Sequence, residues 1–376
     1  MVAKAGVLVR RIPLDYAKEG MLLGRSIIDS EGQVLLRAGV EMEDIYINRL
    51  YELGIRYVYI HDDSLGETDE IEDVITEETR IETVKLVKKT FSSLQSNRKI
   101  NIPALRLVVN RMLDEILDNS NVLLSVSDMT AMDDFIFYHS VSVCTLAIMT
   151  GITLGYDDVK LRDLGIGALL HDIGKSRIDP DIIRREGSLN EEESALLSRH
   201  PEMGFAIIKG HNDVSLLSAH VSFQHHERWD GKGYPRQLAG AAIHEYARIV
   251  SAANIYDELM ADRPNRPPYE VSQALNLIRR MSNIYFDPRV VTAMISNIAV
   301  YPAGTIIKLN TGDIGIVTHI NNTAPHRPVV RIVVDNNMRR VRNPHEVDLS
   351  KMTTIIPVRT ISERELSKLL PGPKGE

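Results

Sequence analysis

Histidine and aspartate residues that could bind metal ions recur through the middle of this sequence. His171 and Asp172 are adjacent, and Lys175 follows one helical turn later, in the pentad HDIGK. An imidazole and a carboxylate side by side offer a nitrogen and an oxygen ligand, a combination that first-row metal ions accept. The other candidate ligands are His139, His200, His225, His226 and Asp257.

Each of these residues is weak evidence by itself. His139 lies in the apolar segment DDFIFYHSVSVCTLAIM, where a hydrogen-bonded core histidine is the alternative. His200 precedes Pro201, which places it at the start of a helix. Asp257 lies in the otherwise apolar segment SAANIYDELM, and a buried carboxylate is costly unless it is paired or bound to a metal ion. Their joint occurrence indicates a metal site.

The size of the set favours two metal ions. Seven ligands are too many for one catalytic ion that must keep an open position, but they suit two ions that share Asp172. Two ions about 3.5–4 Å apart are a standard arrangement for phosphoester hydrolysis, because they activate a water and neutralise phosphate oxygens. Lys175 would stabilise charge that develops on a phosphate oxygen, and a surface lysine at a helix end is the alternative.

Helices are expected to hold these ligands, and residues 121–300 predict a mainly helical domain. The helix LRDLGIGALL leads directly into His171, and its small residues would permit close packing of a neighbouring helix. A further helix from about Val214 is expected to end at the pair His225 and His226.

Residues 63–120 predict an acidic linker and a helical connector. The stretch from Asp62 to Glu82 carries ten acidic residues and one arginine, which is typical of a solvated segment. Helices within 77–120 could pack on the next domain or form a homodimer with a second copy of the chain. Their apolar positions are Ile81, Val84, Val87, Phe91 and Leu94, then Leu105, Val108, Met112 and Ile116.

The two ends of the chain predict smaller units. Residues 1–62 read as a small α+β module, for which a regulatory role and plain packing both stay open. Residues 301–360 predict a β-rich segment with several arginines but no aromatic platform for nucleic acid. Residues 361–376 are expected to be a disordered tail.

Composition places the chain among ordinary globular proteins. The 376 residues are 44% hydrophobic and 25% charged, and the net charge of −7 provides no basic field for nucleic acid. The single cysteine, Cys144, fits a reducing compartment. We see no signal peptide and no membrane-spanning run, so we expect a cytoplasmic protein without a membrane partner.

One motif identifies a family resemblance. The order H…HDxxK…H…HH…D, together with QHHERWDGKGYP at 224–235, resembles the HD-GYP family within the HD superfamily of metal-dependent phosphohydrolases. The segments LLHDIGK, RHPEMG at 199–204 and ADRPNRP at 261–267 extend the resemblance. It implies a mainly α fold, in which an all-helical HD-type catalytic domain carries the small α+β module and the β-rich segment.

The resemblance also implies an activity and a ligand scheme. Members of the family hydrolyse cyclic di-GMP to linear pGpG, often onward to GMP, with iron or manganese. By position, one ion would be held by His139, His171, Asp172 and Asp257, and the other by Asp172, His200, His225 and His226. Some members hold a third ion through a glutamate at the position of Phe135, so we expect two ions here.

Further residues are expected to contact the substrate. Lys175 would reach a phosphate oxygen, and Tyr234 would be presented by the glycine-containing GYP turn. Arg263 and Arg266 suit phosphate and guanine recognition, because the guanidinium fork binds in a bidentate manner. The family usually has an aromatic residue between these arginines, where this chain has Asn265; this puts affinity or base preference in doubt.

Two alternatives remain beside the active cyclic di-GMP phosphodiesterase. The first is a non-catalytic receptor for a cyclic dinucleotide, and the second is a phosphohydrolase for another cyclic dinucleotide. The resemblance further implies diguanylate cyclase (GGDEF) partners. His211, His220 and His244 fall outside the motif and read as surface or core residues, and Glu227 and Asp230 read as residues that orient the loop.

Overall fold

The computed structural model describes most of the chain, including all seven predicted metal ligands. The described residues are 6–7, 9–29, 33–55, 57–61, 67–68, 73–96, 99–119, 122–124, 135–183, 185, 187–261, 268–321, 323–362 and 365–366. Arg263, Arg266, part of the acidic linker (62–66 and 69–72) and the end of the tail lie outside them.

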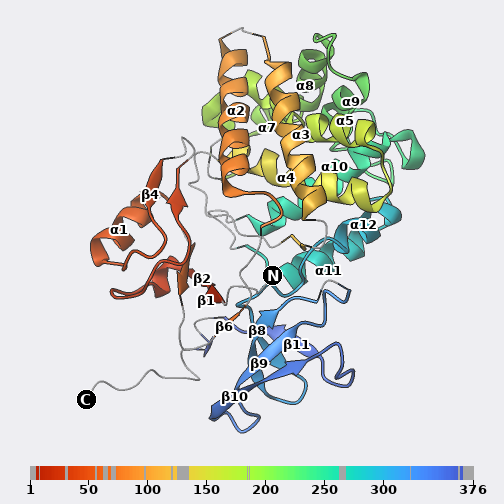
Figure 1. Cartoon of the computed structure of the whole chain (residues 1–376). Coiled ribbons are helices and arrows are strands. Elements are labelled where there is room, and N and C mark those ends of the chain that lie inside the picture. The colour runs from red at the N-terminus through yellow and green to blue at the C-terminus, as the bar shows by residue number, and fades with distance from the viewer. Residues whose placement is uncertain are drawn as a thin grey trace.

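A bundle of helices forms the largest part of the molecule (Figure 1). The helical segments are α2 (Glu77–Gln95), α3 (Ile102–Asp118), α4 (Phe135–Thr153), α5 (Asp158–Leu169), η4 (Ile173–Arg177), α6 (Pro180–Ile183), α7 (Glu191–Leu197), α8 (His200–Lys209), α9 (Leu216–Gln224), η5 (Gly240–Ala242), α10 (Glu245–Met260), α11 (Val271–Met281) and α12 (Pro288–Ile295). The predicted mainly α fold is therefore confirmed.

Helix α4 lies in the middle of this bundle. It packs against α5, α10, α2 and α12, which accounts for its apolar surface on all sides. Among the described residues it is the one helix long and apolar enough to span a membrane, with a mean hydropathy of 1.6, but 67% of that stretch is buried inside the protein. We interpret α4 as a core helix.

Helices α2 and α3 share the hydrophobic core of the bundle. Figure 1 shows them side by side against the other helices. Their predicted apolar positions, among them Val87, Phe91, Leu105 and Met112, are buried in one cluster with residues of α4 and α5. The apolar stripes that could have served a dimer are thus covered by the chain's own helices.

The N-terminal module is the small α+β unit predicted from the sequence. It contains β2 (Val9–Pro13) paired with β5 (Tyr57–His61), and β3 (Ile27–Ile28) paired with β4 (Val34–Leu36), beside α1 (Asp44–Glu52). Its own core includes Ile12, Leu23 and Leu50. A further pair joins β1 (Gly6–Val7) to β6 (Glu67–Thr68).

The C-terminal segment forms one antiparallel sheet with the strand order β10-β9-β8-β7-β11. The sequence predicted β7 (Ile306–Leu309), β8 (Ile314–His319) and β9 (Val329–Val334), and the first four strands follow as a meander. It did not predict β10 (Arg340–Asp348) or β11 (Pro357–Thr360), because these edge strands are largely exposed and lack an apolar run.

Candidate metal centre

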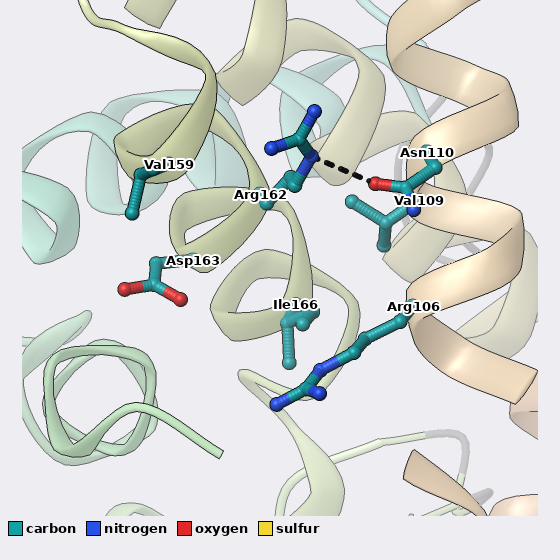
Figure 2. A pocket seen from close by; sticks show the side chains of 7 residues that line it. All are labelled: Arg106, Val109, Asn110, Val159, Arg162, Asp163 and Ile166. Atoms are coloured by element: carbon teal, nitrogen blue, oxygen red, sulfur yellow. Dashed lines mark hydrogen bonds between the residues drawn. The ribbon is translucent and has the colours of Figure 1, made fainter. Parts of the chain in front are cut away.

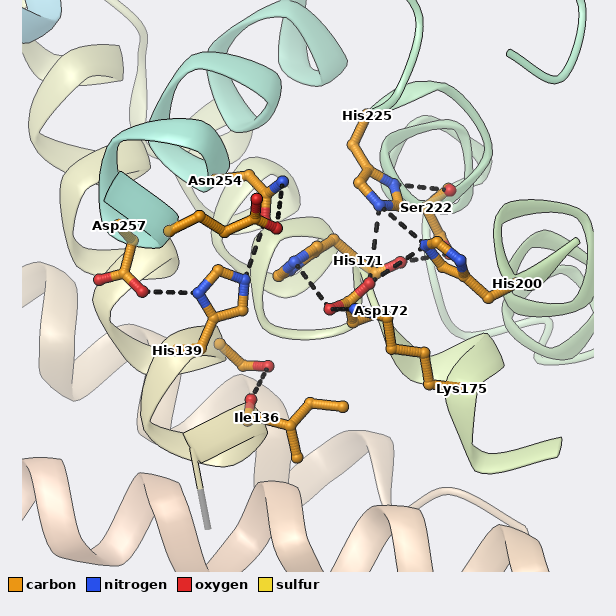
Figure 3. Close-up of polar contacts among 12 residues, drawn as sticks. Ile136, His139, His171, Asp172, Lys175, His200, Ser222, His225, Asn254 and Asp257 are labelled. Atoms are coloured by element: carbon orange, nitrogen blue, oxygen red, sulfur yellow. Dashed lines mark hydrogen bonds and ion pairs between the residues drawn. The ribbon is translucent and has the colours of Figure 1, made fainter. Parts of the chain in front are cut away.

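Most of the predicted ligands converge at one place inside the helical bundle (Figure 3). Their ligand atoms form two groups, and within each group all atoms lie within 4.8 Å of one another. Asp172 belongs to both groups. The first group is His139, His171 and Asp172, and the second is Asp172, His200, His225 and His226.

Two glycines allow the segments that carry these ligands to approach. A Cβ atom on Gly174 of η4 would lie 1.9 Å from the carbonyl oxygen of His200, and one on Gly204 of α8 would lie 2.1 Å from Oγ of Ser222. Only glycine fits at such contacts. The Ser222 hydroxyl also donates a hydrogen bond to the His171 carbonyl at 2.8 Å, which ties α9 to the HD pair.

Three histidines present the same ring nitrogen to the centre. In each, Nδ1 donates to the backbone carbonyl three residues upstream: His171 to Ala168 at 2.7 Å, His200 to Leu197 at 2.7 Å and His225 to Ser222 at 2.9 Å. This bond fixes the tautomer and leaves the lone pair on Nε2. The sequence predicted these histidines as ligands but could not show which nitrogen faces the centre.

Asp172 directs one carboxylate oxygen to each group. Its Oδ1 lies 3.2 Å from Nε2 of His200 and 3.6 Å from Nε2 of His225, and its Oδ2 lies 3.5 Å from Nε2 of His171. The carboxylate is nearly fully buried, with 2% of the side chain exposed. This is the geometry expected of a carboxylate that bridges two cations.

The buried acceptor atoms at this centre fit bound cations. Nε2 of His200 and Nε2 of His225 are only 3.3 Å apart, although both carry lone pairs. Nε2 of His171 and Oδ1 of Asp172 are buried without a hydrogen-bond partner. Buried acceptors without donors are costly, and a positive ion between them would satisfy them. The donor set of imidazoles and a carboxylate therefore fits the predicted pair of metal ions.

The protonation states suit metal binding. Burial lowers the pKa values of His171 and His226 well below the ordinary value of 6.5, and it also lowers the pKa of His225. Burial opposes ionisation of Asp172, but the Lys175 ammonium and His171 hold the pKa of Asp172 well below its usual range. Neutral imidazoles and an ionised carboxylate are the forms that ligate metal ions.

His139 is held differently from the other histidines. Its Nδ1 lies 2.6 Å from Oδ2 of Asp257, and its Nε2 lies 2.8 Å from Oδ1 of Asn254. Asp257 is not a member of either group of ligand atoms. Burial alone would lower the pKa of His139, but the hydrogen bond and charge of Asp257 raise it. The predicted role of Asp257 as a metal ligand stays a prediction.

Lys175 lies at the edge of the centre. Its Nζ is 2.5 Å from Oδ2 of Asp172, and 20% of the lysine side chain is exposed. The ammonium is therefore anchored by the shared carboxylate and still reaches solvent, which is compatible with a contact to an incoming phosphate.

The GYP loop closes the second group. The ring of Tyr234 stacks on that of His226 with centroids 4.7 Å apart. A Cβ atom on Gly233 would lie 2.3 Å from the backbone nitrogen of Arg228, so this turn requires glycine. Buried Glu227 accepts hydrogen bonds from the backbone N–H groups of Arg236 and Leu238, at 2.7 and 3.0 Å, and thus shapes the loop.

Two of the histidines outside the motif form a pair of their own. His220 and His244 stack on each other with centroids 6.3 Å apart and belong to neither group of ligand atoms. Sequence reasoning missed Asn254 and Glu258, which lie with Asp257 on the side of α10 that contacts His139. The sequence held a signal for them, because Asn254 and Glu258 are polar residues in the otherwise apolar segment around Asp257.

A pocket of about 260 Å³ lies elsewhere, between α3 and α5 (Figure 2). Arg162 of α5 donates to Oδ1 of Asn110 of α3 at 3.0 Å across it. None of the predicted site residues lines this pocket. Its lining consists of Arg106, Val109, Asn110, Val159, Arg162, Asp163 and Ile166.

Comparison with protein families agrees with the geometry. Residues 112–290 match the model of the HD domain, and residues 306–369 match a KOW domain associated with the HD domain. The bundle also carries an intact HHERWDGKGYP loop beside the two ligand groups. Residues 112–290 therefore carry an HD domain, and its loop carries the HD-GYP sequence motif. Helices α4 to α11 therefore lie within the HD domain, and the C-terminal sheet lies in the matched KOW segment.

Several characterised proteins are similar to the HD-GYP region. The chain is 34% identical over 227 residues to the cyclic di-GMP phosphodiesterase PA4108 of Pseudomonas aeruginosa, covering 60% of this chain and 54% of the relative. It is 31% identical over 183 residues to the 3′3′-cGAMP-specific phosphodiesterase 1 of Vibrio cholerae, covering 48% of this chain and 41% of the relative. The chain thus spans about half the length of these relatives.

A solved structure covers more of the chain. Bd1817, an HDG"Y"P protein from Bdellovibrio bacteriovorus, is 19% identical, with a TM-score of 0.48. The match covers 76% of this chain and 98% of that protein.

Proposed function

We propose that this chain is a metal-dependent phosphodiesterase that hydrolyses cyclic di-GMP to linear pGpG. The observation that supports it most is the buried Asp172 carboxylate, which offers one oxygen to each of two groups of histidine nitrogens. Two ions bound there would supply Lewis-acid activation of water and would neutralise charge on the phosphate.

The side chains around the centre have separate tasks in this proposal. Asp172 holds the two halves of the site together, and Lys175 donates to a non-bridging phosphate oxygen, where its charge stabilises the developing negative charge. Tyr234, stacked on His226, donates its hydroxyl to the substrate. Burial and the charges of Asp172 and Glu258 raise the pKa of Tyr234, so the phenol stays protonated as a donor.

Two cyclic dinucleotides are candidate substrates. The relatives include proteins named for cyclic di-GMP and proteins named for 3′3′-cGAMP, so hydrolysis of 3′3′-cGAMP is the second candidate. Arg263 and Arg266 are the proposed base- and phosphate-recognition residues. Asn265 stands between them in place of the aromatic residue usual in the family.

Further properties belong to the same proposal. Iron or manganese suits a site of imidazole and carboxylate ligands, and pGpG would be cleaved onward to GMP by a second turnover at the same centre. A cytoplasmic location fits the single free cysteine, Cys144, which is buried.

Two kinds of partner belong to the proposal. Diguanylate cyclases are the proposed source of the substrate. A homodimer through residues 77–120 would have to use surfaces other than the buried stripes of α2 and α3.

The test is an analysis of reaction products. The full chain, prepared without oxygen and loaded with Mn²⁺, is incubated separately with cyclic di-GMP and 3′3′-cGAMP, and the products are separated by chromatography. The proposal expects pGpG from cyclic di-GMP. Faster cleavage of 3′3′-cGAMP would favour the second candidate. A metal-loaded protein that binds both nucleotides and cleaves neither would be a receptor, and the proposal would be wrong.

A further inference from the structure

We propose that the pocket between α3 and α5 is a second ligand site, which binds a guanine mononucleotide such as GMP. None of the described residues that line it is a predicted metal ligand, so this site is distinct from the metal centre. A guanine mononucleotide is one half of the proposed substrate, but binding in this pocket requires neither metal ions nor hydrolysis.

Two arginines from different helices give the pocket hydrogen-bond donors in excess of what the fold uses. Figure 2 shows Arg162 of α5 and Arg106 of α3 on opposite sides of Ile166. A guanidinium group has five N–H donors. In the described part of the chain, Arg162 uses two of them on neighbouring side chains, and Arg106 uses one on a backbone carbonyl. The other donors are available to a ligand.

The charge of Arg106 favours an anionic ligand. Among the described residues its polar contact is with the carbonyl of Asp213, which carries no net charge. Arg162, in contrast, forms an ion pair with Asp158 at 3.3 Å. A guanidinium binds a phosphate in a bidentate manner, and this is among the strongest hydrogen-bonded contacts that arginine makes. Arg106 is therefore the residue proposed to bind the phosphate of the nucleotide.

The Asp163 carboxylate favours guanine over adenine. It borders the same pocket, and among the described residues the contact of Asp163 is through its backbone carbonyl, which accepts from the Ser218 hydroxyl at 2.7 Å. An ionised carboxylate can only accept hydrogen bonds. Guanine offers it the adjacent donors N1–H and N2–H₂, whereas adenine has an acceptor nitrogen at that position. Arg162 can donate to O6 and N7 of guanine, the pair of acceptors that arginine recognises most often.

The size and the apolar wall of the pocket suit a single base. Val109, Val159 and Ile166 provide apolar surface on which a flat ring can lie. The volume is about 260 Å³, just below the range of about 300–1,000 Å³ that is typical of small-molecule sites. A mononucleotide with its phosphate towards solvent is therefore the expected ligand, and an intact cyclic dinucleotide is too large.

The wall of the pocket is held in place before any ligand binds. A Cβ atom on Gly165 of α5 would lie 2.7 Å from Cγ1 of Val109 of α3, so the two helices are in close contact. The side chain of Arg162 also donates to Oδ1 of Asn110 across the pocket at 3.0 Å. A site that is already formed loses little conformational entropy when it binds a ligand.

The alternative is a solvated depression in which the polar side chains only tie α3 to α5. Such a depression would bind anions weakly and without regard to the base. The two interpretations therefore differ in whether GMP is bound more tightly than AMP, which has the same sugar and phosphate.

Isothermal titration calorimetry of the metal-free full chain with GMP, IMP, AMP and inorganic phosphate is the experiment. We expect one GMP to bind per chain. IMP lacks the N2 amino group and should bind more weakly. AMP should bind about tenfold more weakly than GMP or worse, because the carboxylate meets an acceptor in place of a donor. Inorganic phosphate should bind more weakly than GMP.

Two variants locate the bound nucleotide. Asp163→Asn and Arg106→Ala should each weaken GMP binding about tenfold or more. Arg106→Lys, which keeps the charge, should recover part of the second loss. Circular dichroism and thermal unfolding verify that each variant is folded. The matched controls are Asp114→Asn on α3 and Arg280→Ala on α11, both exposed, and they should bind GMP as the wild type does.

Three results would overturn the proposed site. The first is a metal-free wild type that binds no GMP, the second is equal affinity for GMP and AMP, and the third is GMP binding that neither Asp163→Asn nor Arg106→Ala weakens. Each leaves the proposed function standing if the metal-loaded wild type cleaves cyclic di-GMP. Conversely, a chain that binds GMP as described but cleaves no cyclic dinucleotide contradicts the proposed function and leaves the nucleotide site intact.

Discussion

At the scale of single residues, the centre depends on which nitrogen each histidine keeps free. His171, His200 and His225 each give Nδ1–H to the carbonyl three residues upstream, and so present Nε2. His139 has no such carbonyl bond among its contacts in the described structure and relies on Asp257 instead. Local backbone geometry thus orients these three histidines, and a side chain from a distant helix orients His139.

Lys175 is predicted to act on the reaction and not on metal binding. Lys175→Ala should retain both ions, because no predicted ligand is removed, and should lower kcat by about 10²–10³-fold through loss of charge stabilisation at the phosphate. Metal analysis and steady-state kinetics check this. Lys351→Ala is the control, since that lysine is 82% exposed on the C-terminal segment. Loss of metal in Lys175→Ala would show a structural role through Asp172.

The buried histidines predict an acid-sensitive fold in the metal-free protein. His171, His225 and His226 have pKa values lowered from 6.5, so the unfolded chain binds more protons than the folded one as pH falls. Their contribution to stability is full above about pH 6.5 and is lost below it. The raised pKa of His139 acts in the opposite direction but is one group against three.

We therefore expect the Tm of metal-free protein to fall between about pH 7.5 and 5.5. Bound metal would compete with the protons and shift the loss to lower pH. Thermal unfolding with and without Mn²⁺ measures both effects. A metal-free Tm that rises on acidification through this range would contradict the assigned protonation states.

At the scale of elements, the contact of η4 with α8 decides whether the two ligand groups can share Asp172. Gly174 and Gly204 bring the HD segment against the start of α8, where His200 lies. Helix α5 reaches the HD pair through Gly165 and Gly167, whose Cβ positions would lie 2.7 Å from Val109 and 2.6 Å from Val221. Small residues therefore set the spacing of the centre.

Gly174→Ala is expected to disrupt this spacing. The added Cβ would lie 1.9 Å from the His200 carbonyl, and relieving the clash should cost about 3 kcal/mol or more of unfolding free energy and release metal. Chemical denaturation and metal content measure both. Gly210→Ala is the control, because that glycine has a helical φ of −69° and its Cβ would lie 3.3 Å from the nearest atom. Equal stability of the two variants would contradict the packing argument.

Sequence patterns were sufficient for part of this picture. The helices, the N-terminal module and three strands could be predicted because apolar periodicity is strong there, as in α2 and α3. The family motif accounts for the converging histidines and Asp172. The free nitrogens and the contacts of Asp257 and Asn254 with His139 could not be predicted, because they depend on which faces of α4 and α10 meet.

At the scale of the whole molecule, three parts have separate cores. The helical core draws on residues between Val74 and Ile298, the N-terminal core on residues between Ile12 and Ile60, and the sheet on residues from Ile306 onward. An ion pair between Arg25 and Asp73, at 3.2 Å, joins the N-terminal module to the segment before α2. The metal centre lies entirely within the helical core.

Removing the C-terminal sheet should therefore leave the centre intact. A chain of residues 1–300 is expected to keep its helical circular dichroism and its two bound ions, because the sheet's clustered apolar residues pack on one another. Metal analysis and thermal unfolding check this. Loss of either ion on truncation would show that the sheet supports the centre.

The central claim is that one buried carboxylate joins two metal sites into a phosphodiesterase centre. The most direct measurement compares wild type with Asp172→Ala, both prepared without oxygen and supplied with Mn²⁺, for bound metal and for conversion of cyclic di-GMP to pGpG by chromatography. We predict that the wild type holds two ions and forms pGpG, and that Asp172→Ala holds neither ion and forms none. An Asp172→Ala chain that keeps both ions and still forms pGpG would contradict the account.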